Sequence, residues 1–250
     1  MTAPDSVDLG PVDVHVWLTW TDSVDPTDSA RCLVLLSADE RARHDRFHFD
    51  RDRHVYRVAH ALLRTTLSRY APIAPSDWRF VTTSHGRPEL VPGTCKVPLR
   101  FNISHTRGLV ACAVTLEREV GVDVEAADRA DDPLDSMEPY FAPREIASLR
   151  RLPSAAAQRA RFFTLWTLKE AYIKARGLGL EIPLHQFAFD IPPDPESPAA
   201  VAFTPPLVDD PMSWYFARLQ PAEDHFLACA ARCAPGDVVA LRVTTIAPLQ

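Results

Sequence analysis

Two acidic side chains alternate along the short apolar segment Gly121-Val-Asp-Val-Glu125. If this segment is a β-strand, Asp123 and Glu125 project from one face, about 6–7 Å apart, while Val122 and Val124 face a core on the other side. Paired carboxylates on a rigid strand suit Mg²⁺, a hard ion that takes one or two carboxylates and fills its remaining positions with water and phosphate oxygens. The alternative is a pair of carboxylates on a solvated strand edge, although strands are depleted in acidic residues. The segment is therefore a candidate metal site.

A second set of functional groups lies in Trp166-Thr-Leu-Lys-Glu-Ala-Tyr-Ile-Lys174, which has the pattern of a helix. Glu170 and Lys174 are one helical turn apart and share a face, and Trp166 lies on that face as well. A surface ion pair between them would stabilise the helix by only roughly 0.2–0.5 kcal/mol. Beside an apolar wall, the same carboxylate and ammonium could instead serve as a third metal ligand and a phosphate clamp. Both interpretations stay open at this point.

A third segment, Phe101-Asn-Ile-Ser-His-Thr106, has the pattern of a short strand that ends in hydroxyl and imidazole groups. A capping serine and a hydrogen-bonded structural histidine would explain Ser104 and His105 without any function. A Ser–His–Asp hydrolase would need a nucleophile elbow around Ser104, and the sequence has none. Four histidines of the first half lack the compact ligand spacing of a zinc site and are expected at the surface: His44, His48, His54 and His60.

Taken together and in this order, the three segments resemble those of the 4′-phosphopantetheinyl transferase family. The similarity runs from about Arg41 to Phe187. The continuation Lys174-Ala-Arg-Gly-Leu-Gly-Leu180 resembles the longer, monomeric branch of the family, the surfactin-synthetase-activating type that serves nonribosomal peptide and polyketide synthases. The resemblance implies an α+β fold with two similar α/β lobes related by a pseudo-twofold axis. Each lobe would be a small, mostly antiparallel sheet packed on a long helix, with coenzyme A bound between the lobes.

The resemblance also implies roles for residues of the two acidic segments. Asp123, Glu125 and Glu170 would bind Mg²⁺, and Lys174 would contact the diphosphate of coenzyme A. A serine hydroxyl of an apo acyl or peptidyl carrier protein would attack the β-phosphorus of coenzyme A and release 3′,5′-ADP. Glu170 would take the serine proton and Lys174 would offset phosphate charge, so these two are the implied catalytic residues. Whether Glu170 is base, metal ligand or both stays open.

Contacts to the phosphates and adenosine of coenzyme A are implied for residues of the first half: Arg46, Arg51, Arg57, Arg87, Ser104 and His105. Related sequences often carry lysines in the segment before Phe47, where this chain has Arg41, Arg43 and Arg46. Arginine binds phosphate in a forked geometry, so any of the three is chemically suited to the 3′-phosphate. Which of them contacts it stays open.

Two other functions fit parts of this pattern. A non-catalytic module that binds a nucleotide or a carrier protein would keep the phosphate-binding residues and lose part of the carboxylate triad, which is complete here. A different Mg²⁺-dependent phosphohydrolase would release product from coenzyme A without any carrier protein. Carrier docking is expected near Pro139-Tyr-Phe-Ala-Pro143, unless Tyr140 and Phe141 pack into the second lobe instead.

The elements that must position these residues follow from the hydrophobic pattern. Long helices are predicted over residues 52–70, with an apolar stripe, and over 158–176, where Gly177 suits a left-handed cap. Strands are predicted at residues 12–17, 101–104, 109–116, 120–124, 214–219, 226–231 and 238–245.

The segments 108–114 and 225–231 are similar in sequence and suggest two related halves. We expect an N-terminal lobe over residues 1–118 and a C-terminal lobe with the metal site over 119–250. The last strand could pack back on the N-terminal lobe.

Composition limits where and how the chain works. A formal net charge of −6 gives no global attraction to nucleic acid or an anionic membrane, so an anionic ligand needs a local basic patch. The five cysteines include no CxxC pair, and Cys112 and Cys229 lie in apolar runs, so buried thiols in a reducing compartment are expected. Residues 1–5 lack the features of a signal peptide, and no apolar run approaches the roughly 20 residues that span a bilayer. With the resemblance, this predicts a cytoplasmic monomer.

Overall fold

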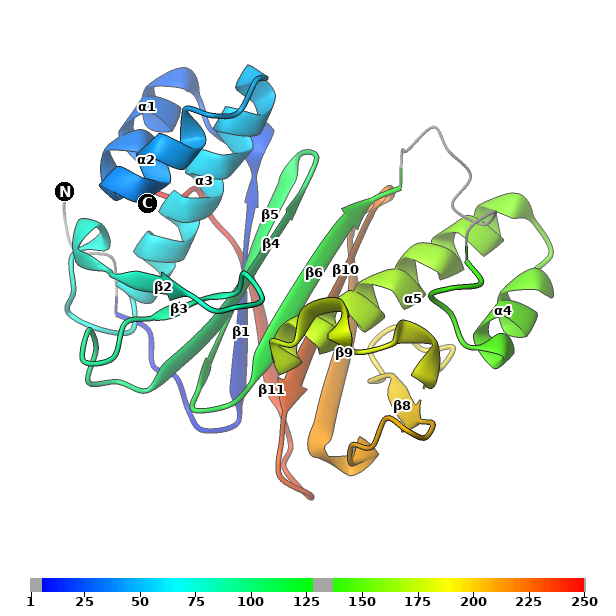
Figure 1. Cartoon of the computed structure of the whole chain (residues 1–250). Helices are drawn as coiled ribbons and strands as arrows, with labels where there is room; N and C mark the ends of the chain where they lie inside the picture. Colours follow the sequence, from blue (N-terminus) through cyan, green and yellow to red (C-terminus); the bar gives the residue numbers. More distant parts are fainter. Residues whose placement is uncertain (1–5, 128–136, 250) are drawn as a thin grey trace. The chain divides into compact units, whose positions relative to one another are not determined.

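The structure of the protein, a computed structural model, describes residues 6–127 and 137–249 (Figure 1). The chain divides into two compact units, residues 1–117 with 239–250 and residues 118–238. Helices and small sheets occur in both units, which confirms the predicted α+β class. Residues 1–5, on which the signal-peptide prediction rested, lie outside the described part of the chain. None of the helices in that part combines the length and the hydrophobicity that a membrane span requires.

The first unit is built on a four-stranded sheet in the order β11-β1-β5-β4. β11 runs parallel to β1, whereas β1–β5 and β5–β4 are antiparallel pairs. The strands are β1 (Asp13–Trp20), β4 (Leu99–Thr106), β5 (Leu109–Leu116) and β11 (Ala240–Thr245). Helix α3 (Asp50–Leu67) packs on the sheet, and its predicted apolar stripe is confirmed, because Val58, Leu62 and Leu63 are buried in one core with Val114 of β5.

Two shorter helices and a hairpin also belong to this unit: α1 (Pro26–Leu35), α2 (Ala38–His44), β2 (Phe80–Thr82) and β3 (Pro88–Leu90). A capping box begins α2, because Ser37 and Glu40 each bond the backbone N–H of the other. Glu40 also bonds two residues of α3, Arg64 at 2.7 Å and His60 at 2.9 Å. Burial raises the pKa of Glu40, but the His60 hydrogen bond and the other partners outweigh burial and lower it to about 2. A charged carboxylate therefore ties α2 to α3.

The second unit is built on a three-stranded antiparallel sheet in the order β6-β10-β9. Its strands are β6 (Val120–Ala126), β9 (Trp214–Ala222) and β10 (His225–Arg232), and the last two form the predicted hairpin. Helix α5 (Ala155–Arg176) lies across this sheet (Figure 1), with Phe163 stacked on Phe226 of β10. The helix ends at Gly177, whose φ of 67° confirms the predicted left-handed cap.

The same unit contains α4 (Pro143–Arg150), β7 (Phe187–Asp190) and β8 (Ala200–Phe203), which contribute to one core with α5. The central strands of the two sheets carry Cys112 and Cys229. Both thiols are free and fully buried, as predicted.

Strand β6 and helix α5 approach each other at Gly121. A Cβ atom added to Gly121 would lie 2.0 Å from the backbone oxygen of Ala171 and 2.4 Å from the backbone nitrogen of Ala175. The two backbones are thus separated only by the glycine hydrogens, and the helix presents small residues to the strand at this point. Because side chains alternate along a strand, Asp123 and Glu125 share the face of β6 that Gly121 turns toward α5.

Gly121→Ala should force the strand and helix apart, because the added methyl group would meet backbone atoms that no rotamer change can move. We expect the free energy of unfolding to fall by about 2 kcal/mol, measured by urea denaturation. Gly10→Ala is the matched control, since its nearest neighbours would be the carboxylate atoms of Asp13, at 3.2 Å and beyond. Equal stability of the two variants would show that the close approach has no energetic importance.

Candidate functional site

Five side chains from β6 and α5 gather on one side of the close approach. On α5, the stripe Trp166, Glu170 and Lys174 repeats every four residues and runs beside the stripe of Ala171 and Ala175 that contacts β6. Asp123 and Glu125 project from the facing side of the strand, whereas Val122 and Val124 point away and are buried, as the alternation predicts.

Hydrogen bonds between side chains join the strand to the helix. Lys174 Nζ donates to Asp123 Oδ1 at 2.6 Å, and Trp166 Nε1 donates to Glu125 Oε1 at 3.2 Å. The side chain of Asp123 is only 5% exposed, so the alternative of a solvated edge does not hold for this residue. The ion pair of Lys174 reaches across to the strand, which is a different arrangement from a surface pair along the helix.

The carboxylates of this cluster influence one another electrostatically. Burial and the negative charges of Asp123 and Glu125 raise the pKa of Glu170, the Lys174 ammonium opposes them, and the net result is a pKa of about 7. The three carboxylates therefore repel one another, and a bound cation would relieve this repulsion.

An all-oxygen donor set of this kind suits a hard divalent cation. In the described part of the chain, no three His, Cys, Asp or Glu side chains are already gathered as a metal site. The cation that Asp123 holds in this structure is the Lys174 ammonium. The chemistry of the donor set thus fits Mg²⁺, with the lysine in contact with one of its expected ligands.

An aromatic cluster adjoins the carboxylates. Trp166 stacks on Phe162 with an interplanar angle of 8° and meets Tyr140 edge-on, with ring centroids 5.5 Å apart. Phe141 packs into the core of the second unit and is 1% exposed, whereas Tyr140 is 40% exposed. Each alternative for this segment therefore holds for one of its two aromatic residues. Phe141 packs into the core, and Tyr140 remains at the surface.

One charged pair was not predicted from the sequence. Lys169, within the motif that supplied Glu170, is completely buried with Glu145 of α4. Burial lowers the pKa of Lys169, and Glu145 opposes this effect. A signal was present, because Lys169 falls on the same buried helical stripe as Leu165 and Tyr172, where a charge needs a partner.

The three arginines before Phe47 differ in their surroundings. Arg41 donates through Nε to the backbone oxygen of Leu36 at 2.9 Å, and through its NH2 group to that of Val34 at 3.0 Å. Arg43 and Arg46 instead line a cavity of about 670 Å³. Arg41 therefore bonds the backbone oxygens at the end of α1, whereas Arg43 and Arg46 face a cavity.

Two arginines of α3, Arg51 and Arg57, differ in their contacts. Arg51 is 80% exposed and lies over the ring of Phe49, 5.1 Å from its centroid. Arg57 donates through Nε to Ser29 Oγ of α1 at 2.6 Å, and Ser29 in turn bonds His54. Arg57 is thus fixed by a neighbouring helix, and Arg51 is not fixed in this way.

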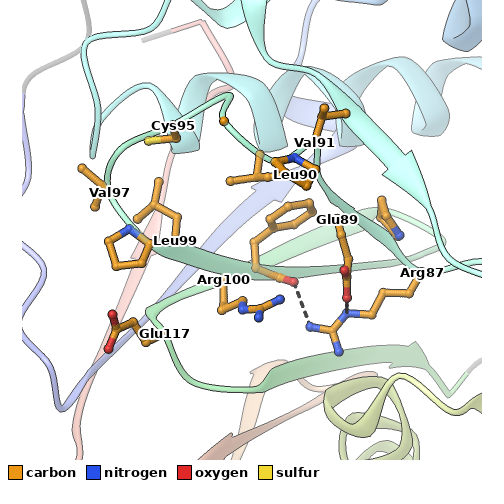
Figure 2. A pocket seen from close by; sticks show the side chains of 14 residues that line it. Arg87, Glu89, Leu90, Val91, Cys95, Val97, Leu99, Arg100 and Glu117 are labelled. Atoms are coloured by element: carbon orange, nitrogen blue, oxygen red, sulfur yellow. Dashed lines mark hydrogen bonds and ion pairs between the residues drawn. The ribbon is translucent and has the colours of Figure 1, made fainter.

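Arg87 lines a second cavity, of about 430 Å³ (Figure 2). Its guanidinium donates to the backbone oxygen of Phe101 at 3.5 Å, and its Nε lies 4.0 Å from Glu89 Oε1. Arg100 and Glu117 are the other charged groups labelled at this cavity in Figure 2. Arg87 is therefore oriented by a strand carbonyl and a carboxylate.

Ser104 and His105 follow each other on β4 and point to opposite faces of the sheet. Ser104 is buried and His105 is exposed. The structure does not bring them together as a pair. Like the arginines, they belong to the first unit, whereas the carboxylates and Lys174 belong to the second.

Comparisons with known proteins match both units to the same family. A model of the 4′-phosphopantetheinyl transferase superfamily matches residues 119–230, and a model of the 4′-phosphopantetheinyl transferase N-terminal domain matches residues 19–117. The 4′-phosphopantetheinyl transferase HetI of Nostoc is 35% identical over 71% of this chain and 74% of its own length. Sfp of Bacillus subtilis is 30% identical over 64% of this chain and 69% of its own length. The rat L-aminoadipate-semialdehyde dehydrogenase-phosphopantetheinyl transferase is 26% identical over 87% of this chain and 73% of its own length.

Proposed function

This chain belongs to the 4′-phosphopantetheinyl transferase superfamily, and we propose that it works through the carboxylates of β6 and the Glu170–Lys174 turn of α5. It is an enzyme that transfers phosphopantetheine to carrier proteins, and it resembles the longer, Sfp-like members. The observation that carries the proposed site is the juxtaposition of three carboxylates, one ammonium and an indole N–H where β6 and α5 meet.

The proposed reaction begins with coenzyme A and an apo acyl or peptidyl carrier protein. The serine oxygen of the carrier forms a bond to the β-phosphorus of coenzyme A, the bond to the departing phosphate breaks, and 3′,5′-ADP leaves. The serine proton must go to a base. Reactions of this type need positioning and charge neutralisation more than covalent assistance.

Glu170 is the proposed base, because a carboxylate that is largely withdrawn from water beside two others accepts a proton more readily than an exposed one. Lys174 is the proposed contact to the diphosphate, since an ammonium has three N–H donors and Asp123 holds this one in place. Trp166 keeps Glu125 turned toward the cluster through its indole N–H.

Asp123, Glu125 and Glu170 are the proposed ligands of Mg²⁺. Their oxygen-only chemistry supports a divalent cation here, as do the burial and the mutual repulsion that raise the pKa of Glu170. When bound, the ion would supply positive charge to the phosphates and polarise their oxygens.

Binding of coenzyme A is further proposed for residues of the first unit: Arg46, Arg51, Arg57, Arg87, Ser104 and His105. Arg46 is favoured with Arg43 for the 3′-phosphate, because both line a cavity while Arg41 is bonded to backbone oxygens. Arg57 has a fixed orientation that would reduce the entropy cost of holding an anion.

We also propose that the units are two similar lobes, in a chain that acts as a monomer. In each unit a long helix, α3 or α5, packs on a sheet with an antiparallel hairpin, β4–β5 or β9–β10. The proposed division along the chain is residues 1–118 and 119–250, except that the last strand, β11, pairs with β1 and so belongs to the first lobe.

Transfer should add about 340 Da to an apo carrier protein incubated with coenzyme A and Mg²⁺, measured by intact mass. Glu170→Gln should abolish this gain, because an amide cannot accept the proton, while Glu223→Gln, at an exposed position, should not change it. Breakdown of coenzyme A with no mass gain on carriers of any synthase class would point to the phosphohydrolase instead. Binding without any reaction would point to a non-catalytic module.

Lys174→Arg should separate the phosphate role of this residue from its structural role. The variant keeps the charge beside Asp123 but replaces a compact ammonium with a planar fork. We expect kcat/KM to fall on the order of 100-fold while the melting temperature stays close to that of the wild type.

Lys174→Ala is the companion variant. It should lose activity and also stability, by roughly 1–3 kcal/mol, because it leaves the buried carboxylate of Asp123 without its cation. Lys96→Ala, at an exposed lysine, is the control. Full activity of the arginine variant would mean that only charge is needed here, and full activity of the alanine variant would remove Lys174 from the site.

A further inference from the structure

A buried ion pair joins α5 to α4. Lys169 Nζ lies 2.9 Å from Glu145 Oε2, and the two side chains are 0% and 1% exposed. Lys169 also donates to the backbone oxygens of Leu184 at 2.8 Å and Phe187 at 2.6 Å. These three acceptors match the three N–H donors of an ammonium.

Glu145 is also bonded to backbone groups from two segments. Its Oε1 accepts from the N–H of Phe189 at 2.9 Å, and its Oε2 accepts from the N–H of Ala142 at 2.9 Å. The pair therefore connects α5, the residue before α4 and strand β7. Because each bond is directional and made in a dry interior, a shift of any one segment would weaken several bonds together.

Lys169 and the segment before α4 both adjoin residues of the proposed site. Lys169 directly precedes Glu170 on α5. Ala142 lies two residues after Tyr140, whose ring meets Trp166 edge-on. Trp166 in turn bonds the carboxylate at the end of β6. The pair thus holds the helix and the aromatic cluster against each other immediately beside the proposed base.

Stability alone is a weak reason for this arrangement. Apolar residues of similar volume often stabilise a core as well as a buried ion pair does, whereas the ion pair adds direction. Only three of the chain's 27 cationic residues are lysines, and two of these, Lys169 and Lys174, lie on α5 on either side of Glu170. The bonds that Lys169 makes need a compact group with donors in three directions, which the planar fork of arginine does not offer.

We propose that Glu145 and Lys169 form a positioning pair that fixes the rotation and axial position of α5, so that Glu170 and Trp166 face the carboxylates of β6. The pair thereby sets the turnover rate of phosphopantetheine transfer. The inference rests on the proposed function, because it takes Glu170 as the acceptor of the serine proton. A misplacement of about 1 Å is enough to lower a rate on the order of 100-fold.

Lys169→Met and Glu145→Gln test the pair, with Tyr172→Phe as the matched control. Tyr172 also holds α5 from a buried position, through a 2.7 Å bond from its hydroxyl to Asp209, but it lies on the opposite side of the helix from Glu170. All three variants remove a buried polar contact of α5. They should therefore share some loss of melting temperature and differ in catalysis.

Steady-state kinetics are measured well below each melting temperature, so that the enzyme is fully folded, and near-UV circular dichroism reports on the aromatic cluster. Lys169→Met should lower kcat about tenfold or more with KM for coenzyme A changed less than about twofold, since a misplaced base acts mainly on the transition state. Its near-UV spectrum should change. Glu145→Gln should shift kcat in the same direction by a smaller factor. Tyr172→Phe should keep the kcat and near-UV spectrum of the wild type.

Wild-type kcat in both folded pair variants would overturn the positioning role, because a merely structural pair changes stability without changing the rate per folded molecule. If Lys169→Met does not fold, wild-type kcat in the folded Glu145→Gln variant alone would overturn the positioning role. A wild-type enzyme that transfers nothing to any carrier would instead overturn the proposed function. The two failures are therefore distinguishable.

Discussion

The contact between β6 and α5 at Gly121 is the constraint on which the proposed site depends. A side chain larger than hydrogen at this position would meet the helix backbone at 2.0 Å, so the strand and helix keep their spacing only with glycine. That spacing places Asp123 within 2.6 Å of Lys174 and Glu125 within reach of the Trp166 indole. A wider separation would lengthen both bonds at once.

The acidic side chains at this contact are largely buried, and a neighbouring ammonium offsets part of their charge. Asp123 is almost completely withdrawn from water, and its carboxylate is offset by one ammonium from the facing helix. Glu170 has a raised pKa because burial and two neighbouring carboxylates disfavour its charged form. Such a cluster of buried carboxylates does not favour stability. Titratable groups with shifted pKa values are, however, typical of functional sites. Helix α5, which carries Glu170 and Lys174, is also held by the hydrogen bonds that Lys169 donates to Leu184 and Phe187.

The sequence predicted those features that depend on local periodicity. The apolar stripe of α3, the β9–β10 hairpin, the alternation of β6 and the cap at Gly177 all follow from spacing along one segment. The alternation rule could also have separated Ser104 from His105, which adjacent positions on a strand place on opposite faces.

Most other features depend on contacts between distant segments and could not be read from the pattern. Helix α1 was missed although Asp25 and Pro26 are a local start signal, and with it the hydrogen bond that Arg57 donates to Ser29. The difference between Arg41, bonded to backbone oxygens, and Arg46, facing a cavity, arises only when the chain folds. The pairing of Lys169 with Glu145 joins residues 24 positions apart in sequence.

The central claim, that the carboxylates brought together by β6 and α5 bind the catalytic cation, is tested most directly by calorimetric titration of Mg²⁺ into the protein saturated with coenzyme A. No carrier protein is present, so the readout is binding and not turnover. The wild type and an Asp190→Asn control, changed at an exposed carboxylate of β7, should bind with the same affinity. Asp123→Asn and Glu125→Gln should each weaken binding by about tenfold or more, because each removes a charged oxygen ligand. Unchanged Mg²⁺ affinity in both variants would contradict the claim.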